Sequence, residues 1–302
     1  MSALVAGIDG GQSSTVAAIG DETGRVLGRG SAGPADEIGQ GSESTRLRDA
    51  LRGALDAARR AASLPESARF DAIVAGISGY DGRVYGRAPE LPSDRIVLLH
   101  DTSIAHAGAL GGRAGVIAIA GTGSVVYGRD DRGGSCTLGG WGYLFGDEGS
   151  AFGIARDSLA MLMRAQDEGD ASLEEASRAA RAYFGAESLR ALVHAVYKGG
   201  IARDRLASFA REAMKSDAFA AVVDRGASRL ATLIGAAIAA GAPARVSLIG
   251  GVFADAAFRD RVERALRDAH PGAEIVPTRY EPECGALLLA YREAGLAVEE
   301  LR

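Results

Sequence analysis

The chain has little lysine, little cysteine and no long apolar run, and each shortage excludes a class of protein. Only Lys198 and Lys215 are lysines, so arginine supplies 32 of the 34 basic residues. A Walker A phosphate loop needs a lysine directly after a glycine, and neither lysine has one before it, which excludes that loop. Schiff-base chemistry is left with these two candidates.

Membrane and nucleic-acid partners are not expected either. The longest apolar stretch, residues 230–242, is shorter than the ~18 residues needed to span a bilayer. The formal net charge of −5 gives no basic field for nucleic acid. Cys136 and Cys284 are far apart in sequence, which fits a reducing compartment, and the first residues do not resemble a signal peptide. These features predict a cytoplasmic protein.

What is abundant is glycine, with 42 residues in a chain of 302. That share is about twice the usual ~7%, and it indicates many tight turns or close backbone approaches to a ligand. Hydrophobic residues make up 47% of the chain and charged residues 24%, as in globular proteins with a substantial core. The length is natural for two domains.

Two successive segments show the same order of elements. The first reads as three strands (LVAGID, TVAAIG, RVLGRG), a helix over residues 43–62, the strands DAIVAGISG and RIVLLHD, and a short helix. The second repeats the three strands as GVIAIAGTGS, VVYGRD and SCTLGG, followed by helices over residues 150–240, RVSLIGG, a helix over 255–269, AEIVP and CGALLLAYREAGL.

This duplication predicts an α/β fold of two like-folded lobes with a nucleotide and substrate cleft between them. The periodicity breaks at residues 111–114, so we expect domains over 1–112 and 113–302. The second would carry a helical insertion, and its last helix would pack back on the first lobe.

A glycine-rich bend follows the first strand of each lobe. In the first bend, Gly10 and Gly11 let backbone N–H groups turn toward an anion, and residues 13–15 add hydroxyl donors. Asp9 is suited to hold a hydrated Mg²⁺ facing such an anion. The second bend, residues 120–124, repeats the arrangement without the acid. Each bend alone could be a plain hairpin, but the pair favours a site for a nucleotide's phosphate chain.

Three further segments have both a structural and a functional interpretation. Asp101 ends a strand before a helix, as either an N-cap or a general base, and His100 beside it is expected to pack or to face solvent. Residues 139–150, GGWGYLFGDEGS, suit a sugar, or else Trp141 fills the core and an acid or serine caps the next helix. Residues 247–255, SLIGGVFAD, indicate a tight strand–helix turn or a place where a base or ribose approaches the backbone.

Together these segments resemble the sugar kinase, heat-shock protein and actin superfamily, with its ribonuclease-H-like (actin-like ATPase) lobes. More narrowly, they resemble the N-acetylglucosamine and glucosamine kinase branch of the BadF/BadG/BcrA/BcrD-type ATPase family. The matching segments are GIDGGQSST, AGISG, HDTSIAHAGAL, AGTGS, GGWGYLFGDEGSAFGIA, LIGGVF and YEPECGALLLA, in this order. The resemblance implies ATP and Mg²⁺, phosphorylation of a hexose 6-hydroxyl, lobe closure and a homodimer.

The resemblance also implies a role for particular residues. Asp101 would be the catalytic base, and Asp9 would face the metal. Phosphate contacts would fall on Gly10, Gly11, Gln12, Ser13, Ser14, Thr15, Gly121, Thr122, Gly123 and Ser124, and adenosine contacts on Gly250 and Gly251. Sugar contacts would fall on Asp36, Gly79, Gly140, Trp141, Asp147 and Glu148.

The sequence departs from the family pattern at two places. Gln12 stands where many superfamily members have glycine, and Ala35 or Asp36 stands near the place of a sugar-binding asparagine. A carboxylate at that place favours the amine of glucosamine over an acetamide, as a hypothesis. The same broad family includes ATPase activators of radical reductases or dehydratases, which bridge an iron–sulfur cluster with two cysteines per subunit. The wide spacing of Cys136 and Cys284 disfavours this alternative.

Overall fold

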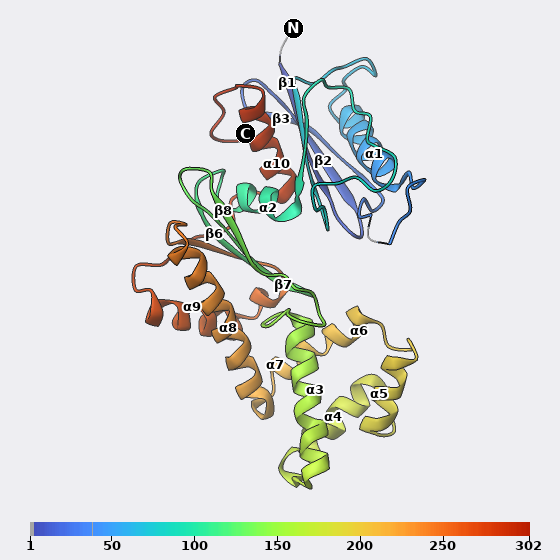
Figure 1. Cartoon of the computed structure of the whole chain (residues 1–302), viewed down its shortest axis with the longest axis vertical. Helices are drawn as coiled ribbons and strands as arrows, with labels where there is room; N and C mark the ends of the chain where they lie inside the picture. The colour runs from blue at the N-terminus through green and yellow to red at the C-terminus, as the bar shows by residue number, and fades with distance from the viewer. Residues whose placement is uncertain (1–2, 38) are drawn as a thin grey trace. The chain divides into compact units, whose positions relative to one another are not determined.

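The structure, a computed structural model, describes residues 3–37 and 39–302 (Figure 1). They divide into two compact units, one formed by residues 3–114 together with Pro277–Arg302 and the other by Gly115–Val276. The expected second domain, 113–302, therefore contains both the second unit and a C-terminal segment that groups with the first unit.

Each unit contains one five-stranded sheet. The first has the order β3-β2-β1-β4-β5, with β1 (Leu4–Gly10), β2 (Thr15–Asp21), β3 (Val26–Ala32), β4 (Ala72–Ile77) and β5 (Ile96–His100). The second has the order β10-β9-β6-β7-β8, with β6 (Gly115–Ala120), β7 (Ser124–Arg129), β8 (Ser135–Gly139), β9 (Arg245–Ile249) and β10 (Glu274–Ile275). In both sheets the first three strands form an antiparallel meander, and the last two run parallel to the first. The predicted α/β fold class and its duplication are confirmed.

Helices cover both faces of the first sheet (Figure 1). On one face lies α1 (Arg46–Ala61), which buries Leu47, Leu51 and Leu55 as the helical spacing predicted. On the other lie α2 (Asp101–Ala109) and α10 (Pro282–Glu293). At Gly7 a Cβ atom would lie 2.1 Å from the backbone nitrogen of Leu287, so only glycine lets α10 approach β1 this closely.

The helical part of the second unit follows its meander. Its helices are α3 (Ala151–Glu168), α4 (Glu174–Phe184), α5 (Leu189–Tyr197), α6 (Arg203–Ser208), α7 (Ala210–Met214), α8 (Ala220–Ala239) and α9 (Ala256–Ala269), with short 3₁₀ turns η1 (Ala171–Leu173), η2 (Asp217–Phe219) and η3 (Gly251–Ala254). Helix α8 packs on β6, β7 and β8, and α9 packs on α8. Among the described residues, no helix is both long and apolar enough to cross a membrane.

Candidate active site

Two acids, Asp9 and Asp101, lie where strands β1, β4 and β5 end, a place we call the β1–β4–β5 edge. These strands are parallel, so their C-terminal ends meet at one side of the sheet. The backbone N–H of Ser78, just after β4, donates to the carbonyl of Gly10 at 2.9 Å. Burial, and the nearby charges of Asp101, Glu283 and Glu281, raise the pKa of Asp9 to about 7.

Asp101 is the first residue of α2 and not its N-cap. The N-cap is His100, so the capping interpretation of Asp101 is not needed. The Asp101 side chain remains 34% exposed, and its Oδ1 lies 2.8 Å from His100 Nδ1. The N–H of Thr102 lies 3.3 Å from the same ring nitrogen, which cannot donate and accept at once. The shorter contact favours a protonated Nδ1 that donates to Asp101, and this hydrogen bond raises the pKa of His100.

Two further acids at the start of α10 were not singled out from the sequence. Glu281 is the N-cap of α10, and Glu283 is buried in its first turn, with Oε1 at 3.6 Å from Arg29 Nη1. The sequence feature that could have pointed to them is the pair of acids around Pro282, ahead of an apolar helix. They add negative charge around Asp9.

The first glycine bend joins β1 to β2. The N–H of Gly11 donates to the carbonyl of Ser14 at 2.9 Å, which closes a tight hairpin, and Gln12, Ser13 and Ser14 are exposed. Thr15 differs, because it is fully buried and its hydroxyl donates to the carbonyl of Gly33 at 2.8 Å. The Thr15 hydroxyl is therefore used within the fold.

The second bend is fastened to the start of α3. The N–H groups of Ala151 and Phe152 donate to the carbonyls of Gly121 and Thr122, at 2.9 and 3.1 Å. The Ser124 hydroxyl donates to the carbonyl of Glu148 at 2.8 Å, so this hydroxyl too is used within the fold. Thr122 is exposed at the tip of the bend.

Asp147 braces the second bend. Its Oδ1 accepts the Ser124 N–H at 3.2 Å, and its Oδ2 pairs with Arg203 Nη2 at 2.9 Å. The residue is 3% exposed and has a φ of +61°, which is unusual for a residue other than glycine. Arg203, at the start of α6, was not predicted, and its guanidinium also lies over the ring of Tyr143 at 4.9 Å.

The glycine pair after β9 adjoins the second bend. Gly250 has a φ of +110°, and a Cβ atom there would lie 2.4 Å from the carbonyl oxygen of Ala120. Because β6 and β9 are parallel neighbours, Gly250 and Gly251 lie beside residues 121–124. The residues predicted to contact phosphate and adenosine in the second unit therefore lie close together. The turn after β9 requires glycine at position 250, because any side chain there would clash with Ala120.

The loop before α3 exposes its aromatic residues. Trp141 is 75% exposed, so the interpretation that it fills the core is wrong. Gly140 donates its N–H to the carbonyl of Ser124 at 3.1 Å, and Glu148 Oε1 lies 3.9 Å from Arg229 Nε. Ser150 is the N-cap of α3 and accepts the Gly153 N–H at 3.0 Å, as one interpretation of the segment expected.

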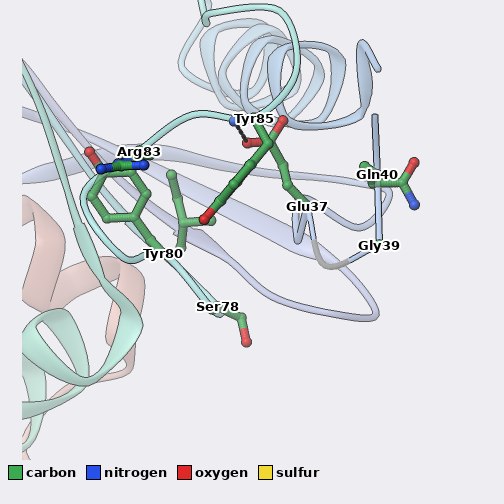
Figure 2. Close-up of a pocket in the computed structure, with 9 residues that line it drawn as sticks. Glu37, Gly39, Gln40, Ser78, Tyr80, Arg83 and Tyr85 are labelled. Atoms are coloured by element: carbon green, nitrogen blue, oxygen red, sulfur yellow. Dashed lines mark hydrogen bonds between the residues drawn. The ribbon is translucent and has the colours of Figure 1, made fainter. Parts of the chain in front are cut away.

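Asp36 and Gly79 lie in the first unit. Asp36 Oδ1 pairs with Arg46 Nη2 at 2.9 Å, so the charge of this carboxylate is offset by α1. Gly79 lines a cavity of about 320 Å³ after β4, together with Glu37, Ser78, Tyr80, Arg83 and Tyr85 (Figure 2).

Comparison with known proteins gives the family. The model of the BadF/BadG/BcrA/BcrD ATPase family matches residues 6–290. The chain belongs to this family. The predicted membership is confirmed.

Two curated relatives and one solved structure are similar to this chain. The chain is 33% identical to the N-acetylmuramic acid/N-acetylglucosamine kinase of Clostridium acetobutylicum over 118 residues, or 39% of this chain and 38% of that protein. It is 27% identical to the N-acetyl-D-glucosamine kinase of Dictyostelium discoideum over 54% of each chain. The matches therefore span about half, or less, of these relatives. A solved structure of a proposed N-acetylglucosamine kinase from Chromobacterium violaceum has a TM-score of 0.75 at 24% identity, covering 95% of this chain and 99% of that one.

Proposed function

We propose that this member of the BadF/BadG/BcrA/BcrD ATPase family is an ATP-dependent kinase that phosphorylates the 6-hydroxyl of an amino sugar of the N-acetylglucosamine type. Family membership and the names of the matched relatives support the proposal. The observation that carries it is the pairing of Asp9 and Asp101 at the β1–β4–β5 edge. The Asp101 carboxylate is suited to accept a proton from an acceptor hydroxyl, and the Asp9 carboxylate is suited to bind a metal ion beside phosphates.

In the proposed reaction, Asp101 orients the sugar hydroxyl and accepts its proton. The hydroxyl oxygen attacks the γ-phosphorus while the bond to the bridging oxygen breaks, and ADP leaves with the bonding electrons. The hydrogen bond from His100 holds the Asp101 carboxylate in place. Backbone N–H groups of residues 12–14 in the first bend and 122–123 in the second would stabilise charge on the phosphates, because those of Gly11 and Gly121 close the bends themselves. Gly250 and Gly251 would adjoin the adenosine.

Asp9 fits the expected magnesium. Mg²⁺ usually keeps several waters and takes one or two carboxylates together with substrate phosphates. Asp9 is a half-buried carboxyl surrounded by three further acids, and a divalent cation would offset this concentration of negative charge. Among the described residues, no three acid, histidine or cysteine side chains form a cage of their own, so phosphate oxygens would complete the coordination. When bound, the ion supplies positive charge next to the transferred phosphoryl group.

For the sugar, we propose contacts from Gly79, Gly140 and the exposed face of Trp141. Asp36 would act as a hydrogen-bond acceptor. Its ion pair with Arg46 offsets the negative charge that would select the glucosamine amine. An Asp36→Asn variant tests this role, and an unchanged preference between glucosamine and N-acetylglucosamine is expected. A switched preference would restore Asp36 as the selector.

The alternative of an iron–sulfur ATPase activator is not favoured. Cys284 is 2% exposed within α10 and accepts a hydrogen bond from Arg29 Nη2 at 2.9 Å. A thiol in this place is not available to bridge a cluster between subunits. Purified protein that contains iron would contradict this conclusion.

The deciding experiment is turnover with Mg-ATP and a panel of hexoses and amino sugars, followed by ADP release and NMR of the product. We expect phosphate at the 6-position of N-acetylglucosamine. Asp101→Asn should lower kcat about 10²–10⁴-fold while nucleotide binding persists. The matched control is Asp94→Asn, at an exposed acid paired with Arg69. Retained turnover in Asp101→Asn would contradict the role of Asp101.

The proposed homodimer is tested by light scattering, where a monomer mass would refute it.

A further inference from the structure

Two irregular stretches of the first unit carry proposed sugar contacts. Asp36 lies in the loop after β3, residues 33–37 and 39–45, which we call the β3 loop. Gly79 lies in residues 78–95, which we call the β4 segment and which is longer than most connections in compact domains. The described residues of both form no helix or strand, so other contacts must fix the distance between them.

A single carboxylate supplies two of these contacts. Glu37, in the β3 loop, accepts the backbone N–H of Tyr85 through Oε2 at 2.8 Å and that of Gly86 through Oε1 at 2.8 Å. Figure 2 shows the first contact as a dashed line. Hydrogen bonds to an ionised acceptor are stronger than those between neutral groups. We call this pair of hydrogen bonds the Glu37 clasp, because it joins the β3 loop to the β4 segment.

Gly86 shows how closely the two stretches approach each other. A Cβ atom at this position would lie 2.3 Å from the carbonyl oxygen of Ser44 and 2.6 Å from Glu37 Oε1, so only glycine fits. The next N–H group, that of Arg87, donates to the same Ser44 carbonyl at 2.7 Å. Three consecutive N–H groups of the β4 segment are therefore bound by the β3 loop, two of them through Glu37.

The cavity after β4 lies between these two stretches. Glu37, Gly39 and Gln40 line it from the β3 loop, and the other lining residues belong to the end of β4 and to the β4 segment (Figure 2). Its volume of about 320 Å³ depends on the distance that the Glu37 clasp sets. Asp36 directly precedes Glu37, and Gly79 lines the cavity, so the clasp also fixes how far apart these two proposed sugar contacts lie.

We propose that Glu37 is a positioning residue for the acceptor sugar, which holds the β3 loop and the β4 segment at the right distance before the sugar binds. The inference rests on the proposed kinase function and deepens it. Both oxygens of Glu37 face the main chain, so the residue acts through the two stretches and not on the reacting atoms. Preorganisation of this kind raises the affinity for the sugar and leaves the chemical step unchanged.

The first test compares Michaelis constants at a temperature where every variant is folded. Glu37→Ala removes both hydrogen bonds and should raise KM for N-acetylglucosamine roughly tenfold, with kcat and KM for ATP within about twofold of wild type. Glu37→Gln keeps one acceptor oxygen and should raise it about threefold. The matched control is Glu43→Gln, because Glu43 joins the same two stretches through an exposed ion pair with Arg87 at 2.6 Å, and KM should stay within about twofold.

A second variant opens the clasp from the other side. Gly86→Ala keeps Glu37 but places a methyl group against the Ser44 carbonyl and Glu37 Oε1, so it should also raise KM for the sugar. Combined with Glu37→Ala it should add little, because both substitutions break the same contact. Fully additive effects of the two substitutions on KM would contradict a shared role.

Hydrogen exchange and calorimetry without nucleotide separate this inference from the kinase proposal. N-acetylglucosamine should slow the exchange of the Tyr85 and Gly86 amides in wild type, whereas a clasp that only stabilises the fold would show no dependence on sugar. Sugar binding that Glu37→Ala weakens, in a wild type that releases no ADP, would refute the kinase and support the positioning role. Turnover in which Glu37→Ala raises both KM values equally, or lowers only the melting temperature, would overturn the positioning role and leave the kinase. A wild type that binds no sugar would overturn both.

Discussion

Asp9 and Asp101 show how the same functional group is prepared differently by its surroundings. Asp9 lies among further carboxyls and is partly shielded from water, which disfavours its charged form. Asp101 has a hydrogen-bond donor, His100, at 2.8 Å. In the proposed reaction, Asp9 would bind a metal ion, whose positive charge offsets the surrounding carboxyls. Asp101 would accept a proton, and the hydrogen bond from His100 keeps its carboxylate in place for that role.

The raised pKa of Asp9 makes stability depend on pH. An ordinary Asp ionises near 3.8, but folded Asp9 ionises near 7, so between these values the folded state holds a proton that the unfolded chain has released. Stability therefore falls as the pH rises through this window. Asp9→Asn lacks this loss, so its melting temperature should gain about 5 °C relative to wild type between pH 4 and pH 8 in metal-free buffer. If the melting temperatures of wild type and Asp9→Asn instead changed by the same amount between pH 4 and pH 8, the burial of Asp9 would be contradicted.

The contact between His100 and Asp101 raises a pKa as well, here because it stabilises the charged form of the imidazole. The folded-state pKa of His100 is raised by its hydrogen bond to Asp101, so this contribution to stability is present below the ordinary value of 6.5 and is lost as the pH rises through the raised value. NMR titration of the imidazole should give a pKa above 6.5 in wild type. In Asp101→Asn it should fall toward the ordinary value, and in Asp94→Asn it should not change. An unchanged titration in Asp101→Asn would rule out the contact.

At the scale of elements, α6 holds the second bend through a single arginine. Removing Arg203 leaves Asp147, whose side chain is 4% exposed, as a buried carboxylate without its cation. We expect Arg203→Met to lower stability by about 1–3 kcal/mol and to raise KM for ATP more than it lowers kcat. Arg211→Met, at an exposed position on α7, serves as the control.

The conformation of Asp147 sharpens this test. Asparagine adopts a positive φ readily and keeps an oxygen to accept the Ser124 N–H, whereas alanine does neither. Asp147→Asn should therefore be milder than Asp147→Ala in both melting temperature and KM for ATP. Equal effects of the two substitutions would mean that Asp147 does not brace the bend.

The elements were predictable because their patterns are local. Apolar runs ending in turns marked the strands, and Leu47, Leu51 and Leu55 marked α1, although this helix begins at Arg46 and not at residue 43. The contacts of the site were less predictable. Arg203 and Asp147 are 56 positions apart, and their meeting depends on how α6 packs near α3. Likewise, the sequence does not reveal that the hydroxyls of Thr15 and Ser124 are used within the fold.

At the scale of the molecule, the first unit is built from both ends of the chain. The apolar cluster on the α2 side of its sheet joins residues of the strands and α2 to residues of α10. The members are Val5, Ala18, Ala72, Val74 and Ile104 together with Ala286, Leu287, Ala290 and Tyr291. The C-terminal residues also pair with the β2–β3 turn, where the Arg302 N–H donates to the carbonyl of Gly24 at 2.9 Å.

Loss of the C-terminal segment should therefore unfold one unit selectively. A chain that ends at Val276 exposes the apolar face of β1 and β4, whereas the cluster of the second unit lies wholly within residues 115–276. Hydrogen exchange should show protection lost over residues 3–114 and kept over the second sheet. Tyr291→Phe, which removes only the hydroxyl bond to the Asp21 carbonyl, is the control and should keep protection in both units. Protection of residues 3–114 in the shortened chain would mean that α10 is dispensable, because the remaining elements of the first unit would then bury enough apolar surface without it.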